Sequence, residues 1–245
     1  MGTGVIRYGL QYTCFIIEAG LIFYLVRGSQ LKRRLTPLSY LVSLLVAALT
    51  RACVLHKYGF TSPQYSYVYW ATDFLLVICA FLLVCLFFRR ACVQQEKLWR
   101  FVRLLLVFIF LLLIGISGLS FLRNYSRLPT YIIVEFSQNL YFTCLVLNTL
   151  LYLLLQQIDS ADDQLGLLVC GVGIQFAGPA ATMALLHLTT GERFAASLNS
   201  FTIPVCTLGM LLVWAYAITR VQDTSTEVAR PKAPVLAEVT AHLNL

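Results

Sequence analysis

The sequence predicts an all-α membrane protein, a polytopic bundle of about seven transmembrane helices, on three observations. Hydrophobic residue types make up 59% of the 245 residues and charged types only 12%, whereas soluble domains carry roughly a quarter charged residues. The apolar residues are gathered in runs of about 20, the length that a helix needs to cross a bilayer. Most Lys and Arg residues fall in the short segments between these runs.

The predicted spans follow one another with short connections, which makes consecutive helices antiparallel neighbours. They cover residues 5–26, 37–54, 67–88, 98–119, 130–155, 165–188 and 198–218. The first run lacks a basic leader and a small-residue cleavage site, so we expect a span and not a signal peptide. The third, fourth and seventh spans end in aromatic side chains typical of headgroup level, namely Tyr65, Tyr67, Tyr69, Trp70, Trp99 and Trp214. The sixth run is interrupted by several Gly residues, a Gln and a Pro.

Residues 1–220 are expected to form one transmembrane domain and residues 221–245 a short cytoplasmic tail. The tail begins with polar residues and contains Pro231 and Pro234. We therefore expect it to be mobile, and it is too short to be an independent output domain.

The basic residues predict an orientation with the N-terminus outside and the C-terminus in the cytoplasm, because loops rich in Lys and Arg stay cytoplasmic. One side would receive Arg27, Lys32, Arg33, Arg34, Arg89, Arg90, Lys97, Arg100, Arg103, Arg220, Arg230 and Lys232. The other side would receive only Arg7, Arg51, Lys57, Arg123, Arg127 and Arg193. The loop at residues 156–164 does not fit this charge pattern, because it is expected on the cytoplasmic side but its only charges are acidic. Acidic residues count little in this rule.

Several polar side chains lie inside the predicted spans, where an unpaired charge is unfavourable. With a rise of about 1.5 Å per residue, Arg51, Asp73 and Glu135 lie at similar depth in the outer half of the membrane. Glu18 lies deeper, near the middle. We predict an intramembrane polar network, in which Arg51 pairs with Asp73, made of Glu18, Arg51, Asp73, Glu135, Gln138 and Asn139.

Two interpretations of this network stay open. It forms a polar pocket open to the outside, or the mouth of a proton or ion path. Alternatively, it is an ion pair with hydrogen bonds that holds the helices together, as polar contacts between membrane helices often do. Glu18 is the stronger functional candidate, because its depth makes an unpaired charge costly.

The sixth span carries small residues at four-residue spacing, which lets two helices approach closely. These are Gly173, Ala177 and Ala181, with Pro179 among them. The pattern favours core packing, with a hinge or a dimer face as the alternative. Pro204 in the seventh span has the same two interpretations.

The cysteines and histidines do not form a metal-binding motif. None of the eight Cys residues belongs to a CxxC pair, and most lie in apolar runs, which is typical of small buried hydrophobic residues. We predict no cofactor or metal. A haem or metal held by His56 and His187 is the alternative, since both histidines are expected at the outer interface.

Known seven-span and catalytic motifs do not occur. Residues 198–218 contain no Lys to hold retinal and no Asn-Pro-x-x-Tyr motif, and the chain has no GxSxG, HExxH, P-loop or GxGxxG pattern. In the number and orientation of its spans over residues 5–218, the chain resembles uncharacterised bacterial seven-transmembrane-helix proteins and the seven-helix sensor modules that precede histidine kinases. This resemblance implies no residue roles.

These observations predict a non-catalytic membrane module, either a receptor-like sensor or an accessory subunit of a membrane complex. The alternative is an ion- or proton-coupled transporter, or a channel-like protein, that uses the charged residues of the network. The expected partners are the lipid bilayer and either another membrane protein or further copies of this chain. No nucleic acid is expected, because the basic residues follow the loops. The expected location is a bacterial inner or plasma membrane.

Overall fold

The computed structural model describes the helices of the chain from Gly2 to Val228. Residues 1, 28–30, 60–61, 94, 124–128, 158–161, 189–191 and 229–245 lie outside the described part. Side chains are described for residues 9–27, 35–59, 62–93, 95–116, 118–119, 136–157, 162–182 and 201–219.

Seven helices make up the described chain, and the predicted all-α transmembrane bundle is confirmed. They are α1 (Gly2–Arg27), α2 (Leu31–Tyr58), α3 (Pro63–Ala91), α4 (Glu96–Arg123), α5 (Pro129–Gln157), α6 (Asp163–Leu188) and α7 (Glu192–Val228). Each contains a stretch long and apolar enough to cross a membrane, and the described residues form no strand. α7 continues to Val228, past residue 220, where the sequence predicts the tail to begin. Which end of the bundle faces the cytoplasm stays a prediction.

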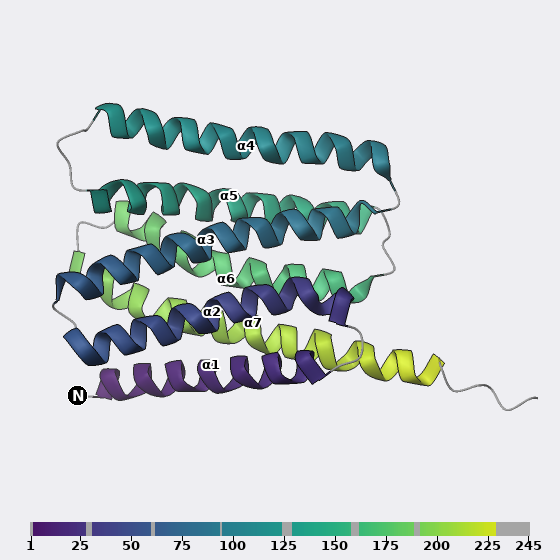
Figure 1. The fold of residues 1–245 in the computed structure, drawn as a ribbon, viewed down its shortest axis with the longest axis horizontal. Coiled ribbons are helices and arrows are strands. Elements are labelled where there is room, and N and C mark those ends of the chain that lie inside the picture. The colour runs from purple at the N-terminus through teal and green to yellow at the C-terminus, as the bar shows by residue number, and fades with distance from the viewer. Residues whose placement is uncertain are drawn as a thin grey trace, which may run out of the picture.

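α3 occupies the centre of the bundle (Figure 1) and packs against α2, α4, α5 and α6. The most extensive helix contact is between α6 and α7, and α1 covers α2 and α7. α4 lies at one edge and packs only on α3 and α5. A displacement of α3 would therefore change the packing of more helices than a displacement of an edge helix such as α4.

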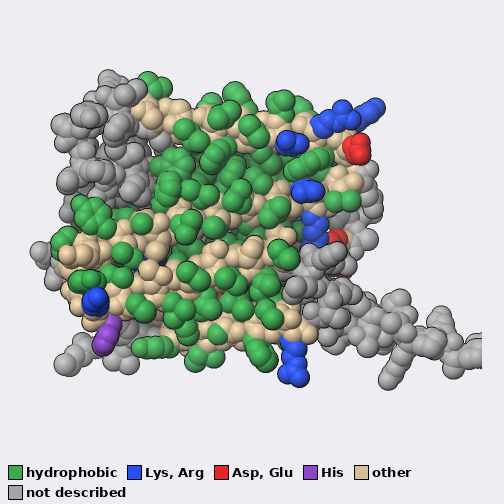
Figure 2. All heavy atoms as spheres, viewed as in Figure 1, with side chains coloured by type: hydrophobic (Ala, Val, Ile, Leu, Met, Phe, Trp, Pro, Cys, Tyr) green, Lys and Arg blue, Asp and Glu red, His purple; other side chains and the backbone are tan. Residues whose placement is uncertain are grey.

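The two ends of the bundle differ in charge. The basic end is where α1 and α3 end and α4 begins. Its described charged residues are the cations Arg27, Arg89, Arg90, Lys97, Arg100 and Arg103 and the acids Glu96, Asp162 and Asp163. The opposite end, here called the α2–α3 end because α2 ends and α3 begins there, carries His56 and Lys57. Between the two ends the visible surface is covered by hydrophobic side chains (Figure 2), as expected of a surface in contact with lipid.

A short turn between α2 and α3 brings these two helices side by side. Gly59 follows α2 with a positive φ of 77°, a conformation that glycine adopts without steric cost. Ser62 then caps α3 by accepting a hydrogen bond from the Tyr65 backbone N–H at 3.2 Å, and Pro63 occupies the first turn, where its missing N–H costs nothing. The turn sets the relative depth of polar residues on the two helices.

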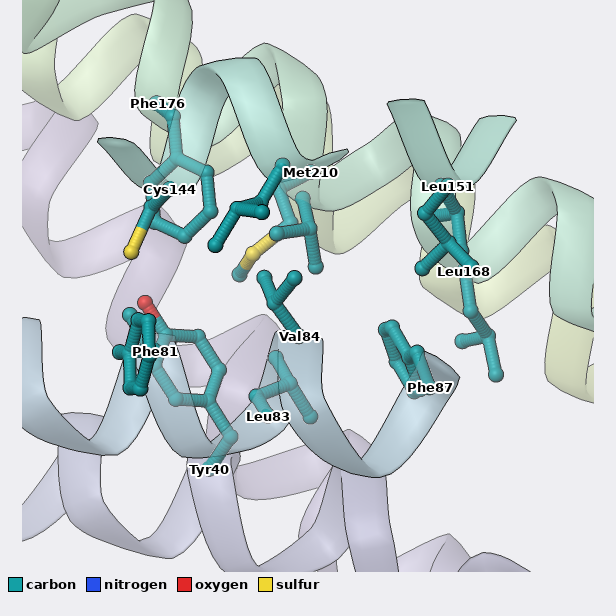
Figure 3. Packing of buried hydrophobic residues seen from close by; sticks show 14 of the residues in the cluster. Tyr40, Phe81, Leu83, Val84, Phe87, Cys144, Leu151, Leu168, Phe176 and Met210 are labelled. Atoms are coloured by element: carbon teal, nitrogen blue, oxygen red, sulfur yellow. The ribbon is translucent and has the colours of Figure 1, made fainter. Parts of the chain in front are cut away.

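The interior of the bundle is close-packed and mostly apolar. Figure 3 shows Phe87 of α3 near Leu151 and Leu168, and Val84 facing Met210. All five side chains are at most 1% exposed. Since lipid is as apolar as these side chains, the helices are held together by packing and by polar contacts more than by exclusion of water.

Glycines allow the closest approach in the bundle, between α6 and α7. A Cβ on Gly171 would lie 2.6 Å from Cδ1 of Trp214, and a Cβ on Gly178 would lie 2.7 Å from Sγ of Cys206. Ala177 is exposed. Within the described chain, α6 therefore meets α7 through its glycines and not through the predicted stripe.

The three residues of the predicted stripe, Gly173, Ala177 and Ala181, do not pack against one common neighbour. Gly173 faces α5, because its Cβ would lie 2.9 Å from Nδ2 of Asn148, while Ala177 and Ala181 are exposed. A dimer face there stays a prediction. Both helices run unbroken through their internal prolines, Pro179 and Pro204.

Candidate polar site inside the bundle

A cluster of polar side chains, here called the Arg51 cluster, joins α2, α3 and α5 towards the α2–α3 end. It comprises Arg51, Tyr69, Thr72, Asp73 and Tyr141. Arg51 lies about 10 Å along the helix from the end of α2, and Asp73 lies about 15 Å from the start of α3. Nη2 of Arg51 lies 3.6 Å from Oδ1 of Asp73, so the structure brings together the two residues that the sequence analysis paired.

The Arg51 guanidinium has several partners on α3. Its Nε donates to Oγ1 of Thr72 at 2.7 Å, and its Nη2 donates to the Tyr69 carbonyl at 3.4 Å. The group also lies 4.3 Å from the centre of the Tyr69 ring, within the range of a cation–π contact. Arg51 thus keeps several contacts that do not depend on Asp73.

Asp73 depends more strongly on the ion pair. Besides Arg51, it accepts a long hydrogen bond from the Tyr141 hydroxyl, at 3.4 Å. The side chains of Arg51 and Asp73 are 23% and 19% exposed, so neither is fully enclosed. The cluster is close to neutral overall. It can hold α2, α3 and α5 together, and it offers a donor and an acceptor to a small polar ligand that separates the pair.

Glu18 lies apart from this cluster. It is nine residues from either end of the span Gly9–Arg27, and it shares the buried face of α1 with Cys14 and Leu21. Sγ of Cys14 lies 3.6 Å from the Pro204 carbonyl, which places this face against α7. Glu18 is 5% exposed, and its Oε1 has no hydrogen-bond partner in the described part of the chain.

The other three predicted residues of the network lie on α5. Gln138 and Asn139 are half-buried on α5, while the side chain of Glu135 lies outside the described residues. The contact from α5 to Asp73 comes from Tyr141, one turn closer to the middle of the span. The long Tyr141 side chain reaches Asp73 of α3 from a deeper position, a contact that depth along the helix axis alone does not predict.

The predicted histidine pair lies partly outside the described residues. His56 is exposed near the end of α2, and the side chain of His187 lies outside the described residues. Among the side chains described, no group of three His, Cys, Asp or Glu residues could hold a metal ion. The predictions about cofactors stay predictions.

A second ion pair, absent from the predicted network, lies at the basic end. Nη2 and Nε of Arg90 donate to Oδ2 of Asp162 at 2.7 and 3.0 Å, and Nη2 also reaches Oε1 of Gln164 at 3.5 Å. Oδ1 of Asp162 accepts from the backbone N–H of Leu165 and thereby caps α6. The pair ties the end of α3 to the start of α6. Its signal was present in the sequence as opposite charges assigned to the same side of the membrane.

Polar groups inside the apolar core were also missed. Nδ2 of Asn148 donates to the Val169 carbonyl at 3.0 Å, and Nε1 of Trp214 donates to the Leu168 carbonyl at 3.0 Å. Trp214 is 0% exposed, so its indole ring is enclosed by the bundle and does not face lipid. It is buried because Gly171 leaves space for the indole ring on α6.

No protein-family model, curated protein or solved structure matches this chain. By length and composition, its seven apolar helices are compatible with an integral membrane protein.

Proposed function

We propose that this integral membrane protein is a receptor-like sensor, in which the Arg51 cluster receives the signal and α3 carries it to the basic end. One observation carries the proposal: the central helix has an ion pair towards each end. Asp73 joins α3 to Arg51 of α2, and Arg90 joins α3 to Asp162 at the start of α6.

The two pairs are far apart but share one rigid element. Asp73 and Arg90 are separated by about 25 Å along the helix. A ligand can shift a conformational equilibrium only by its different affinity for the two states. A small polar ligand that separates Arg51 from Asp73 would meet this condition, because it replaces contacts that hold α3 against α2. Packed helices then change position by small shifts between discrete arrangements.

The output would be read at the basic end. Four exposed cations, Arg89, Lys97, Arg100 and Arg103, lie near the Arg90–Asp162 pair along the chain, and Figure 2 shows Lys and Arg side chains gathered at this end. Such a surface favours a partner with an acidic face. If the chain is an accessory subunit of a larger membrane complex, the same surface is where the complex would dock.

Spin labels placed at the basic end test the coupling. Labels at Val93→Cys and Asp163→Cys, both exposed positions, report the distance between the C-terminal end of α3 and the start of α6. The exposed Cys53 and Cys170 are first replaced by Ser. We expect Arg51→Gln to shift the distance distribution measured by pulsed electron paramagnetic resonance.

Thr50→Ala is the matched control, because Thr50 is exposed and its hydroxyl bonds only to the carbonyl of Val46 in its own helix. It should leave the distribution unchanged. Identical distributions for the parent and Arg51→Gln, with both proteins folded, would overturn the proposal. A purified chain that moves a solute across proteoliposome membranes would favour the transporter instead. Native purification with mass spectrometry would identify a stoichiometric partner of an accessory subunit.

A further inference from the structure

The most enclosed charged group in the described chain is Glu18, on the inward face of α1. It is 5% exposed, whereas Ile16 and Phe23 on other faces of α1 are 69% and 67% exposed. The carboxyl group therefore points into the bundle and not towards lipid. Its Oε1 is buried and lacks a hydrogen-bond partner in the part of the chain that the structure describes.

No described cation neutralises Glu18. α7 has no Lys, Arg or His between residues 201 and 219, and Arg27 lies at the end of α1. On α2, Tyr40 is the titratable group within electrostatic range of Glu18, and Arg51 lies about 16 Å farther along that helix. Cys14, the titratable neighbour on α1, already contacts the Pro204 carbonyl.

An ionised carboxylate with no partner is strongly unfavourable at this depth, so the site calls for a positively charged ligand. Metal cations of the hard class need several oxygen ligands. Glu18 instead shares its face of α1 with Leu21 and Leu25, which are buried. A proton is the one cation that needs no further ligand. We propose that Glu18 is a proton-binding site in the interior of the membrane.

This site is placed to influence the Arg51 cluster. Tyr40 lies within electrostatic range of both Glu18 and Asp73, and Tyr141 lies within range of Tyr40 and donates to Asp73. Figure 3 shows the Tyr40 hydroxyl pointing from α2 into the core towards Cys144. A proton gained by Glu18 removes a negative charge beside Tyr40 and changes the potential at Asp73. This second step rests on the proposed function; the proton-binding site itself does not.

Infrared difference spectroscopy in lipid nanodiscs tests the site directly, because a protonated carboxyl group has a C=O stretch that a carboxylate lacks. We expect a pH-dependent C=O band in the wild-type protein, lost in Glu18→Gln and shifted in Glu18→Asp. Asp163→Asn is the matched control, since Asp163 is an exposed carboxylate, and it should keep the band. The spectra are compared in sodium and in potassium buffers.

Two results would overturn the proposal. One is a folded wild-type protein with no C=O band that depends on Glu18 at any pH. The other is a carboxylate stretch that depends on Glu18 and responds to sodium, which would mean a metal cation. Tyr40→Phe separates the two proposals: the band should remain, while any effect of pH on the spin-label distance at the basic end should disappear. A wild-type protein that has the Glu18 band but no pH-dependent change in the spin-label distance leaves the proton site standing and contradicts its coupling to the sensor.

Discussion

The Arg51–Asp73 pair predicts an asymmetry between its two single mutants. At 3.6 Å and an effective dielectric constant of about 20, the direct attraction is about 4.6 kcal/mol. Partial exposure of both side chains reduces this figure. Interhelical polar contacts measured in membranes average about 0.6 and reach about 1.7 kcal/mol. We therefore expect a coupling free energy of about 1 kcal/mol between the two residues.

The partners that remain after each substitution set the order of the two losses. In Asp73→Asn, Arg51 keeps Thr72 and the ring and carbonyl of Tyr69. In Arg51→Gln, Asp73 keeps only the long bond from Tyr141 among the described residues. A charge left unpaired in a low-dielectric site costs more than the contact it loses. The expected losses in unfolding free energy are about 2 kcal/mol for Arg51→Gln and about 1 kcal/mol for Asp73→Asn.

The double mutant should lose about 2 kcal/mol and not the sum of the two, because it buries no unpaired charge. The assay is unfolding from mixed micelles with increasing sodium dodecyl sulfate, followed by circular dichroism. Thr50→Ala should change the unfolding free energy by no more than about 0.5 kcal/mol. The reasoning is refuted if Asp73→Asn is the more damaging change, or if the two losses simply add.

Three further predictions use the same unfolding assay. Gly171→Ala should destabilise the protein by about 1–3 kcal/mol, because its Cβ would lie 2.6 Å from Trp214. Gly166→Ala is the control and should be neutral or stabilising, because its Cβ would have nothing within 4 Å. Equal effects of the two substitutions would contradict the packing of α6 on α7. Trp214→Phe should lose about 1 kcal/mol, since the Leu168 carbonyl loses its donor, and an unchanged protein would argue against that bond. Arg90→Lys keeps the charge but not the paired contact with Asp162, so it should lose about 1 kcal/mol. An unchanged unfolding free energy would indicate a purely Coulombic pair.

The fold was predictable because the bilayer imposes one strong rule on the sequence. Backbone groups in the hydrocarbon must be satisfied within each helix, so seven apolar runs mean seven helices. The proximity of Arg51 and Asp73 was predictable for a related reason. The short turn at Gly59 and Ser62 fixes the relative depth of α2 and α3, and depth follows from a constant rise per residue.

Rotation of each helix about its axis was not predictable. In a soluble bundle the apolar stripe shows which face is buried, but here lipid and protein both favour apolar side chains. α6 contains one set of small residues on the Gly173–Ala177–Ala181 face and another at Gly171 and Gly178. The positions of Trp214 and Cys206 on α7 select between them, and that is a property of two helices together. For the same reason the sequence could not separate a lipid-facing tryptophan from a buried one.

The sensor and proton-site proposals converge on how α3 is packed. Between Asp73 and Arg90 its inward face is a continuous apolar layer, in which Val77, Val84 and Phe87 are at most 1% exposed. A close-packed layer of this kind resists local deformation. A displacement of α3 at Asp73 would therefore move the helix at Arg90 as well. Polar groups gathered only at one end would suit a structural clamp. Ion pairs towards both ends of one stiff central helix suit the proposed sensor better. Tyr40, within electrostatic range of both Glu18 and Asp73, would then link the proposed proton site to that helix.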